Sequence, residues 1–358
     1  MARIRVVVAE DSLTVRKRLV ETLESDPGLQ VVAEAEDGKC AIELCQSLRP
    51  DVMTLDMMMP VMTGLAVTEY VMAYCPTPIL IVSASVNRGE LFKTYEALAA
   101  GAVDVLEKPA AGTDSKVWEE KLVSTVKLIS RIKVITHPRA RFIHPPLAAQ
   151  PGSNGAGMSS LRGLARPAVV ALGASTGGPG AILEILRALP ADFPVPVLVV
   201  IHLAELFAQA LAEWLDGQSP IRVRYARDGE PLPPKGVLLA PPGRHLALCQ
   251  GRLRLLAEPE RHSCRPSVDV LFESLAREMA SRCIVCLLTG MGKDGARGLL
   301  AARRAGAVTI AQNEASSVVF GMPGEAVRLG AAQRVLAIEE IAPALIALTN
   351  GTERRQRA

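Results

Sequence analysis

Short, strongly apolar runs alternate with segments of helical spacing along the first third of the chain. The runs span residues 4–9, 52–55, 79–82 and 103–106, and between them apolar side chains recur every three or four residues. Such alternation predicts parallel strands joined by helices, with both faces of the sheet covered. Ligands of such sheets bind beyond the carboxyl ends of the strands, so the residues that follow each run are the first candidates for function.

The chain has 358 residues, and at about 100–200 residues per domain this length predicts more than one domain. Residues 131–166 divide it, because they hold six basic and no acidic side chains and are rich in Pro, Gly and Ser. This composition predicts a linker, either a solvated tether or a basic segment that docks on the acidic first domain. We therefore expect a first domain at 1–128, a linker at 129–166, a second domain at 167–350 and a tail at 351–358.

Polar side chains stand at the carboxyl ends of the apolar runs. Glu10 and Asp11 follow the first run, and Asp56 follows the run at 52–55. Three carboxylates at one edge repel one another unless a cation is present, and hard oxygen ligands suit Mg²⁺. Ser83 and Lys108 follow the later runs and offer a hydroxyl and an ammonium to the oxygens of a phosphoryl group. The pattern predicts a site at which Asp56 accepts phosphate.

Residues 3–125 resemble the receiver domain of two-component response regulators. The resemblance rests on Glu10-Asp11, Asp56-Met-Met-Met-Pro60, Ser83-Ala84 and Lys108-Pro109. It implies a flavodoxin-like, doubly wound α/β fold, a histidine kinase as phosphodonor, and Mg²⁺ held by Asp11 and Asp56. Many receivers have Tyr or Phe three residues before the lysine, where this chain has Val105. The conformational switch is therefore expected to work through packing alone or to couple more weakly.

A glycine-rich turn follows the apolar run at 168–172. Gly173-Ala-Ser175-Thr-Gly177 has the form of a nucleophile elbow and lies between a predicted strand and a predicted helix. Small flanking residues let the backbone turn sharply and expose the hydroxyl, and the helix N-terminus offers N–H groups to an oxyanion. The alternative is a phosphate-binding loop, although Gly173–Gly180 lacks both the G-x-G-x-x-G pattern and a Gly-Lys-Ser/Thr.

A serine nucleophile needs a base, and His202 stands directly after the apolar run at 197–201. His245 is the main competitor for this role, and His262 is a weaker one. Asp294 lies in the loop after the run at 283–288, where it can either orient an imidazole or cap the helix that follows. Ser175, His202 and Asp294 thus occupy three strand ends, and a hydrolase site is expected where they meet.

These residues and several further motifs resemble the catalytic domain of the chemotaxis protein-glutamate methylesterases. The motifs are Gly173-Ala-Ser175-Thr-Gly-Gly, His202, Ala240-Pro-Pro-Gly-Arg-His245, Arg265-Pro-Ser-Val-Asp269-Val-Leu-Phe, Thr289-Gly-Met-Gly-Lys-Asp294-Gly-Ala and Val318-Val-Phe-Gly-Met-Pro323. The match covers residues 167–348, and a receiver, a linker and this domain are the family's own arrangement. It implies an α/β domain with a mostly parallel sheet, in which Ser175 is the nucleophile, His202 the base and Asp294 the orienting acid.

The resemblance also implies a reaction and its control. Members of this family hydrolyse γ-glutamyl methyl esters on chemoreceptors with release of methanol, and some deamidate receptor glutamines. The backbone N–H groups of Thr176 and Met291 are expected to hold the oxyanion, with no metal at the ester site. An unphosphorylated receiver is expected to block the catalytic cleft until Asp56 is phosphorylated. One departure from the family pattern is the apolar Ile201, which removes a polar neighbour of His202.

Charge and composition argue against other classes of function. The net charge of +3 is too small to indicate nucleic-acid binding, and the second domain shows no basic recognition helix. The longest apolar runs reach about half the length of a membrane span, and the early acidic residues argue against a signal peptide. We expect a cytoplasmic enzyme that binds no nucleic acid and does not insert into membranes. A phosphorylation-controlled scaffold with a vestigial site and a nucleotide-binding output domain are the alternatives.

Overall fold

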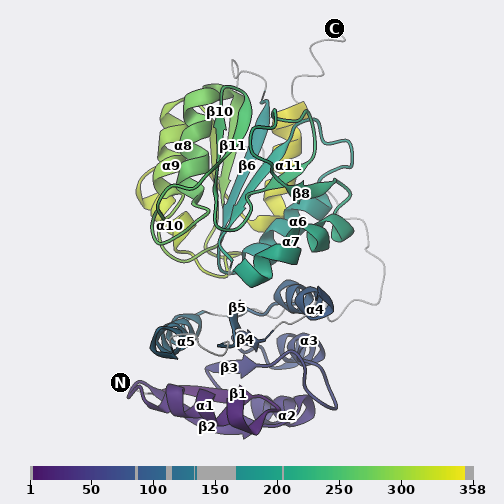
Figure 1. Cartoon of the computed structure of the whole chain (residues 1–358), viewed down its shortest axis with the longest axis vertical. Helices are drawn as coiled ribbons and strands as arrows, with labels where there is room; N and C mark the ends of the chain where they lie inside the picture. The colour runs from purple at the N-terminus through teal and green to yellow at the C-terminus, as the bar shows by residue number, and fades with distance from the viewer. Residues whose placement is uncertain are drawn as a thin grey trace, which may run out of the picture.

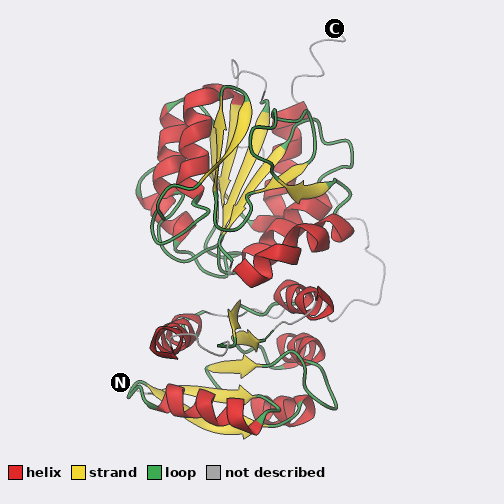
Figure 2. Ribbon diagram, in the orientation of Figure 1, coloured by secondary structure: helices red, strands yellow, loops and turns green. Residues whose placement is uncertain are grey.

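The computed structural model describes residues 3–84, 88–109, 115–132, 134, 167–203 and 205–350. These residues form two α/β halves that lie one above the other in Figures 1 and 2. The predicted linker at 129–166 falls almost wholly outside the described residues, and the predicted tail at 351–358 falls wholly outside them. The domain boundaries therefore stay predictions.

The first half is a five-stranded parallel sheet with helices on both faces. Its elements are β1 (Ile4–Ala9), α1 (Leu13–Glu24), β2 (Leu29–Ala35), α2 (Gly38–Leu48), β3 (Val52–Leu55), α3 (Gly64–Tyr74), β4 (Ile79–Ser83), α4 (Arg88–Ala99), β5 (Asp104–Glu107) and α5 (Ser115–Ile129). The strand order β2-β1-β3-β4-β5 is that of flavodoxin-like domains, which confirms the predicted doubly wound fold. Helices α1 and α5 pack on one face, and α2, α3 and α4 pack on the other.

The second half is built around a seven-stranded sheet. Its elements are β6 (Val169–Ala174), α6 (Gly178–Ala188), β7 (Val197–Ile201), α7 (Glu205–Gln218), β8 (Val223–Tyr225), β9 (Val237–Leu239), β10 (His245–Cys249), β11 (Arg252–Leu256), α8 (Val268–Glu278), the 3₁₀ turn η3 (Ala280–Arg282), β12 (Cys283–Leu287), α9 (Ala296–Arg304), β13 (Val308–Gln312), α10 (Met322–Arg328), β14 (Arg334–Leu336) and α11 (Ile338–Asn350).

Every strand pair in this larger sheet is parallel, in the order β14-β13-β12-β6-β7-β9-β8, and β10 and β11 form a separate antiparallel hairpin. The mostly parallel sheet expected for this half is confirmed. Helices α8, α9 and α10 cover one face, and α6, α7 and α11 cover the other. Because β6 lies between β12 and β7, the loops that follow these three strands meet at one edge.

Helix α8 lies directly over the end of β6. A side chain at Gly173 would place its Cβ 2.2 Å from Cγ1 of Val268, the first residue of α8, so only glycine permits this close approach. The N-terminus of α8 therefore comes next to the turn that carries Ser175. Because the turn and the N-terminus of α8 lie close together, a residue in the loop between β12 and α9 can contact both.

The two halves pack against each other through α4, which lies on α6 and α7 (Figure 1). The ring of Tyr95 on α4 lies 5.1 Å, centroid to centroid, from the ring of Trp214 on α7, and both side chains are buried. At the edge of this contact Arg88 pairs with Glu213 at 3.3 Å. The buried apolar side chains on this side of both sheets form one continuous core.

Candidate functional site

An acidic cluster lies at the carboxyl ends of β1, β3 and β5. The Nζ atom of Lys108 lies 2.7 Å from Oε2 of Glu10 and 3.0 Å from Oδ1 of Asp56, and both carboxylates are buried. Asp11 is exposed at the rim, and buried Ser83 accepts a hydrogen bond from the backbone N–H of Lys108 at 3.0 Å. The structure brings all five predicted residues to one edge of the sheet.

Charge in this cluster is only partly balanced. Burial raises the pKa of Glu10; the hydrogen bond from Lys108 opposes that rise and the charge of Asp56 adds to it. Burial alone would lower the pKa of Lys108, but its two carboxylate partners outweigh burial and raise it. One ammonium therefore faces two buried carboxylates, and Asp11 adds a third negative charge at the rim.

The same residues fit a divalent metal ion. Glu10, Asp11 and Asp56 each offer a carboxylate oxygen, and these oxygens lie within 4.8 Å of one another. An all-oxygen set with an excess of negative charge suits a hard cation such as Mg²⁺ rather than a thiophilic one. The donor chemistry and the unbalanced charge both support a cation at this position.

Ser175 occupies the tight turn between β6 and α6. Its backbone N–H donates to the carbonyl of Thr289 at 3.0 Å, and its own carbonyl accepts from Gly178 N–H at 2.7 Å. Gly177 has φ +75°, in the left-handed region, and a Cβ there would lie 2.6 Å from Val318. The turn therefore needs the small residues of this motif, and it holds Ser175 half-buried at the N-terminus of α6.

His202 follows β7, one strand away from Ser175. Its backbone N–H donates to the carbonyl of Ala174 at 3.0 Å, which fixes the end of β7 beside the end of β6. Its ring Nε2 lies 2.9 Å from Oδ2 of Asp294. Burial alone would lower the pKa of this imidazole, but hydrogen bonds to Asp294 and Cys264 outweigh burial and raise the pKa to about 9.

Asp294 performs two tasks that the sequence presents as alternatives. While Oδ2 faces His202, the same carboxylate accepts from the backbone N–H of Val268 at 2.7 Å and of Asp269 at 3.1 Å, at the start of α8. It also accepts from Gly295 N–H at 3.0 Å and from the hydroxyl of Ser267 at 2.8 Å. A carboxylate has about four acceptor sites, so orienting an imidazole and capping a helix do not exclude each other. The helix that it caps is α8 rather than α9, which immediately follows it.

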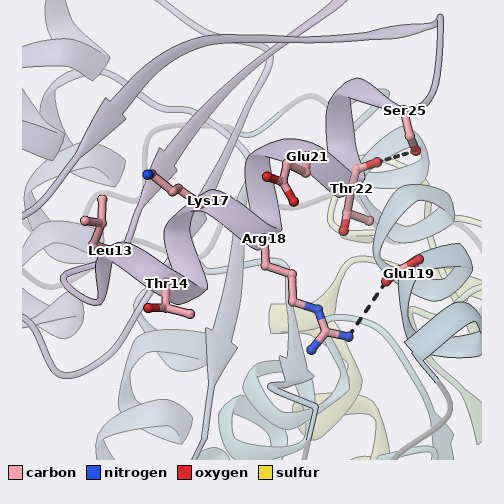
Figure 3. Close-up of a pocket in the computed structure, with 8 residues that line it drawn as sticks. All are labelled: Leu13, Thr14, Lys17, Arg18, Glu21, Thr22, Ser25 and Glu119. Carbon is pink, nitrogen blue, oxygen red and sulfur yellow. Dashed lines mark hydrogen bonds and ion pairs between the residues drawn. The ribbon is translucent and has the colours of Figure 1, made fainter.

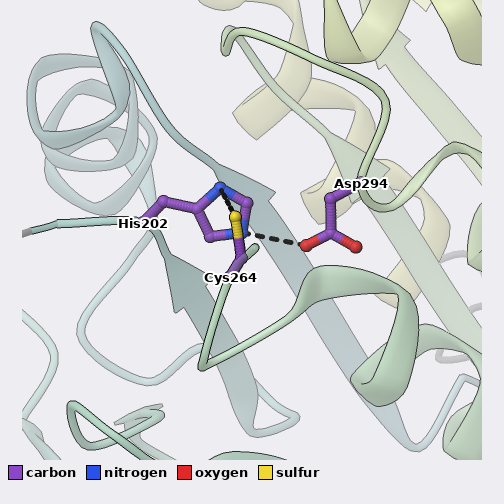
Figure 4. Close-up of side chains that lie close together, drawn as sticks. All are labelled: His202, Cys264 and Asp294. Atoms are coloured by element: carbon purple, nitrogen blue, oxygen red, sulfur yellow. Dashed lines mark hydrogen bonds and ion pairs between the residues drawn. The ribbon is translucent and has the colours of Figure 1, made fainter. Parts of the chain in front are cut away.

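A thiol that the sequence analysis did not single out lies against the face of the His202 ring. The Sγ atom of Cys264 lies 3.5 Å from Nδ1, in front of the ring in Figure 4, and within 4.8 Å of a carboxylate oxygen of Asp294. Among the residues that the structure describes, no side-chain hydrogen bond joins Ser175 to His202. Of the two contacts in a Ser–His–Asp triad, the described residues therefore make the Asp–His contact and lack the Ser–His contact.

The competing histidines have other partners. His245 is fully buried; its Nδ1 accepts from Ser267 N–H at 3.0 Å, and its Nε2 lies 3.1 Å from the carbonyl of Pro259. Both ring nitrogens are thus used inside the fold. His262 places Nε2 3.1 Å from Oδ2 of Asp269. Of the three candidates, His202 is the one that touches Asp294.

Thr176 and Met291 border the serine from two loops. Within the described part of the chain, the backbone N–H of neither residue has a hydrogen-bond partner. Gly290, next to Met291, is packed so closely on the serine that a Cβ there would lie 2.8 Å from the Cβ of Ser175. Stabilisation of an oxyanion requires N–H groups that are not used inside the fold, and the loops beside the serine offer two of them.

Comparison with known proteins identifies the family. The CheB methylesterase family model matches residues 170–345, and the response regulator receiver domain model matches residues 6–116. A protein of Anaeromyxobacter dehalogenans named protein-glutamate methylesterase/protein-glutamine glutaminase 2 is 44% identical over 346 residues, 97% of each chain. This chain belongs to the CheB methylesterase family.

A second curated relative matches over nearly its whole length, and a solved structure matches the second half of the chain. The protein-glutamate methylesterase/protein-glutamine glutaminase 4 of Myxococcus xanthus is 41% identical over 352 residues, 98% of each chain. The crystal structure of the Thermotoga maritima CheB methylesterase catalytic domain is 36% identical, covers 51% of this chain and 100% of its own, and gives a TM-score of 0.49. In this chain the two family models match successive parts, the receiver model first and the methylesterase model second.

In this CheB-family chain the receiver lies against the loop that carries the serine. The hydroxyl of Thr176 donates to Oδ2 of Asp104 on β5 at 3.0 Å. Burial raises the pKa of Asp104, and hydrogen bonds from Val105 N–H and Thr176 work in the opposite direction. Beside this contact a cavity of about 520 Å³ lies between the halves, lined from both sides by residues that include Leu98, Gly177 and Val318.

A second hollow, of about 680 Å³, lies on the outer surface of the receiver between α1 and α5 (Figure 3). Leu13, Lys17 and Glu119 are among its lining residues, and Arg18 reaches across it to Glu119. Neither the acidic cluster nor the Ser–His–Asp set lines it. Among the described residues, no helix is both long and apolar enough to cross a membrane.

Proposed function

We propose that this chain is a protein-glutamate methylesterase and protein-glutamine glutaminase whose receiver controls access to the catalytic centre. Its substrates are methylated glutamates, and glutamines, of chemoreceptors, and its phosphodonor is a chemotaxis histidine kinase. The observation that carries the proposal is the 2.9 Å contact of His202 with Asp294, at strand ends that adjoin Ser175. The names and near-complete coverage of the curated relatives support the substrate class.

The ester chemistry uses residues of the catalytic half alone. Ser175 Oγ attacks the ester carbonyl while Nδ1 of His202 accepts its proton, since Nε2 is held by Asp294. The N–H groups of Thr176 and Met291 stabilise the oxyanion. The imidazolium then gives its proton to the departing methoxide oxygen, which leaves as methanol, or to the departing amide nitrogen of a glutamine, which leaves as ammonia. Water then hydrolyses the acyl-serine to release glutamate.

The receiver supplies the control. Asp56 is the phosphate acceptor, and Lys108 and Ser83 contact the phosphoryl oxygens. Asp11 and Asp56 would hold Mg²⁺, which would supply positive charge to the phosphoryl oxygens. All seven cysteines are unpaired, which fits a reducing compartment and supports action in the cytoplasm.

Strand β5 offers a short connection between the two centres. Lys108, which contacts Asp56, directly follows β5, and Asp104, which holds Thr176, begins it. A phosphoryl group on Asp56 adds negative charge beside Lys108 and alters the position of this strand end. Release of Asp104 from Thr176 then frees the loop that carries Ser175. The change is a shift between a packed and a released arrangement of the halves.

Methanol release from a methylated chemoreceptor signalling fragment tests the proposal. Rates are measured with and without Mg²⁺ and a small-molecule phosphodonor, for the wild type, Ser175→Ala and Asp56→Asn. We expect phosphodonor to raise the rate, Ser175→Ala to abolish it, and Asp56→Asn to keep only the basal rate. Exposed Ser47→Ala and Asp192→Asn are the matched controls, and both should behave as the wild type.

Two results would contradict the proposal. Methanol release that persists in Ser175→Ala would exclude this serine as the nucleophile. An absence of release from several receptor fragments, while Asp56 still accepts phosphate, would favour the scaffold alternative.

A further inference from the structure

Thr289 lies between β12 and the loop that carries Met291 and Asp294, and no step of the proposed ester chemistry uses one of its atoms. It is buried, and each of its polar groups has a partner. Its backbone N–H donates to Oε1 of Gln312 at 2.8 Å, and its carbonyl accepts from Ser175 N–H at 3.0 Å. Its hydroxyl donates one hydrogen bond and accepts another. A residue with these bonds can fix the backbone on which the nucleophile stands.

The hydroxyl of Thr289 connects the serine turn to the segment before α10. It donates to the carbonyl of Thr176 at 2.9 Å and accepts from Val319 N–H at 2.9 Å. The N–H of Thr176 belongs to the planar peptide group between Ser175 and Thr176. Thr289 holds the peptide groups on both sides of it, one through Ser175 N–H and the other through the Thr176 carbonyl. These two bonds therefore fix the direction of the Thr176 N–H.

The loop of Met291 rests on the same segment before α10. The backbone N–H of Gly290 donates to the carbonyl of Val319 at 3.0 Å, and the carbonyl of Gly290 accepts from Gly321 N–H at 3.1 Å. A Cβ on Gly321 would lie 2.8 Å from this carbonyl oxygen and 3.3 Å from Cα of Met291, so the packing requires glycine. Because Thr289 also bonds to Val319, one side chain joins the backbones of both proposed oxyanion donors.

We propose that Thr289 is a positioning residue of the esterase, whose hydroxyl keeps the N–H groups of Thr176 and Met291 at the separation that an oxyanion needs. The two donors lie on loops that follow different strands, β6 and β12. Donors act on the transition state only where they are preset at about 2.7–3.1 Å from the oxyanion. Loss of the hydroxyl should therefore lower kcat and change KM little, because the charge develops after the substrate has bound. The inference rests on the proposed function.

The hydroxyl can be removed with little change of shape by Thr289→Val. Rates of methyl-ester hydrolysis are measured with Mg²⁺ and phosphodonor, so that release of the receiver does not limit them. We expect kcat to fall about 10–100-fold, and KM to change by less than about threefold. Thr289→Ser keeps the hydroxyl and should keep most of kcat. Thr289→Ala differs from Thr289→Ser by the hydroxyl alone and should be as slow as Thr289→Val, which gives a second comparison with less crowding.

Thr309→Val is the matched control. Thr309 on β13 is fully buried, and its hydroxyl donates to the carbonyl of Ala331 at 2.7 Å and accepts from Gln333 N–H at 3.1 Å. The control thus loses the same two kinds of bond from an equally buried threonine, on a strand that β12 separates from β6. Its Tm should fall by about as much as that of Thr289→Val, whereas its kcat should stay that of the wild type. An equal loss of kcat in Thr309→Val would overturn the proposal, because the effect would then be one of stability.

Labelling with a fluorophosphonate tests the same geometry without the receptor substrate. The probe forms a bond between its phosphorus and Oγ of Ser175 and loses fluoride, while the serine proton passes to His202. Its phosphoryl oxygen takes the place of the oxyanion, so labelling should slow in Thr289→Val and Thr289→Ala but not in Thr289→Ser or Thr309→Val. Thr289→Val or Thr289→Ala that labels and hydrolyses like Thr289→Ser would refute the positioning role. A wild type that labels at Ser175 but hydrolyses no receptor ester would refute the proposed function, and the labelling rates would still decide the role of Thr289.

Discussion

Replacing Tyr95 with Phe should make the unphosphorylated protein less active, because it should tighten the packing of the receiver. The ring of Tyr95 is fully buried against Trp214, and its hydroxyl has no hydrogen-bond partner among the described residues. When α4 is released from α7, the same hydroxyl reaches water. Burial of the hydroxyl therefore destabilises the packed arrangement, and Phe removes this free-energy cost while it keeps the ring.

The size of the effect follows from the cost of burying a hydroxyl. A buried polar group without a partner costs about 1–3 kcal/mol. If about 1–2 kcal/mol of this applies to the packed arrangement alone, Tyr95→Phe raises the packed-to-released ratio about 5–30-fold. Where most molecules are packed, basal activity is proportional to the released fraction and should fall by the same factor.

Initial rates of methyl-ester hydrolysis, measured without phosphodonor and in the Asp56→Asn background, report this basal activity. Tyr74→Phe is the matched control, because its ring is exposed, and it should leave the rate unchanged. Small-angle X-ray scattering should show a more compact average particle for Tyr95→Phe. A basal rate that stays constant or rises in Tyr95→Phe, with an unchanged Tm, would refute the reasoning.

Three charged groups give further tests. His202 must be neutral to accept a proton, and its pKa is raised to about 9, so kcat/KM should rise with pH up to about 9 in a pH profile. Asp294→Asn should lower kcat by about 10⁴-fold, and it should also lower the Tm measured by circular dichroism, because this carboxylate caps α8. Burial raises the pKa of Asp104 in the packed arrangement, so that arrangement binds the proton more tightly and acid should favour it. Basal rates should consequently fall more steeply with falling pH in the wild type than in Asp104→Asn.

The sequence predicted both sheets and most of the candidate residues because they follow buried parallel strands. Such strands are continuous apolar runs, as in β1, β3, β6 and β12, and a polar residue directly after one stands out. Strand β2 (Leu29–Ala35) lies at an edge, with exposed and half-buried positions, and its run was not recognised. The same holds for the short β14, of which no residue is fully buried.

Contacts between distant segments escaped prediction. Cys264 lies 62 positions from His202, in a loop that carries no periodic pattern, and only the turn at 261–264 brings its thiol to the ring. Asp104 and Thr176 belong to different halves, 72 positions apart. The sequence offered capping as a task of Asp294 but assigned it to the helix that follows, because capping of α8 involves a helix that begins 26 positions earlier. Spacing along the chain carries no information on such pairings.

The bond between Asp104 and Thr176 also links the enzyme to the abundance of its own substrate. If a receptor segment binds at the N–H of Thr176 as proposed, it approaches the residue whose hydroxyl Asp104 holds, and receiver and substrate would compete for this loop. Thermodynamic linkage then works in both directions: phosphorylation strengthens substrate binding, and bound substrate holds the receiver away. In a dense receptor array, mass action alone would keep part of the enzyme open. The array would thereby maintain a minimum rate of demethylation that kinase signalling cannot lower.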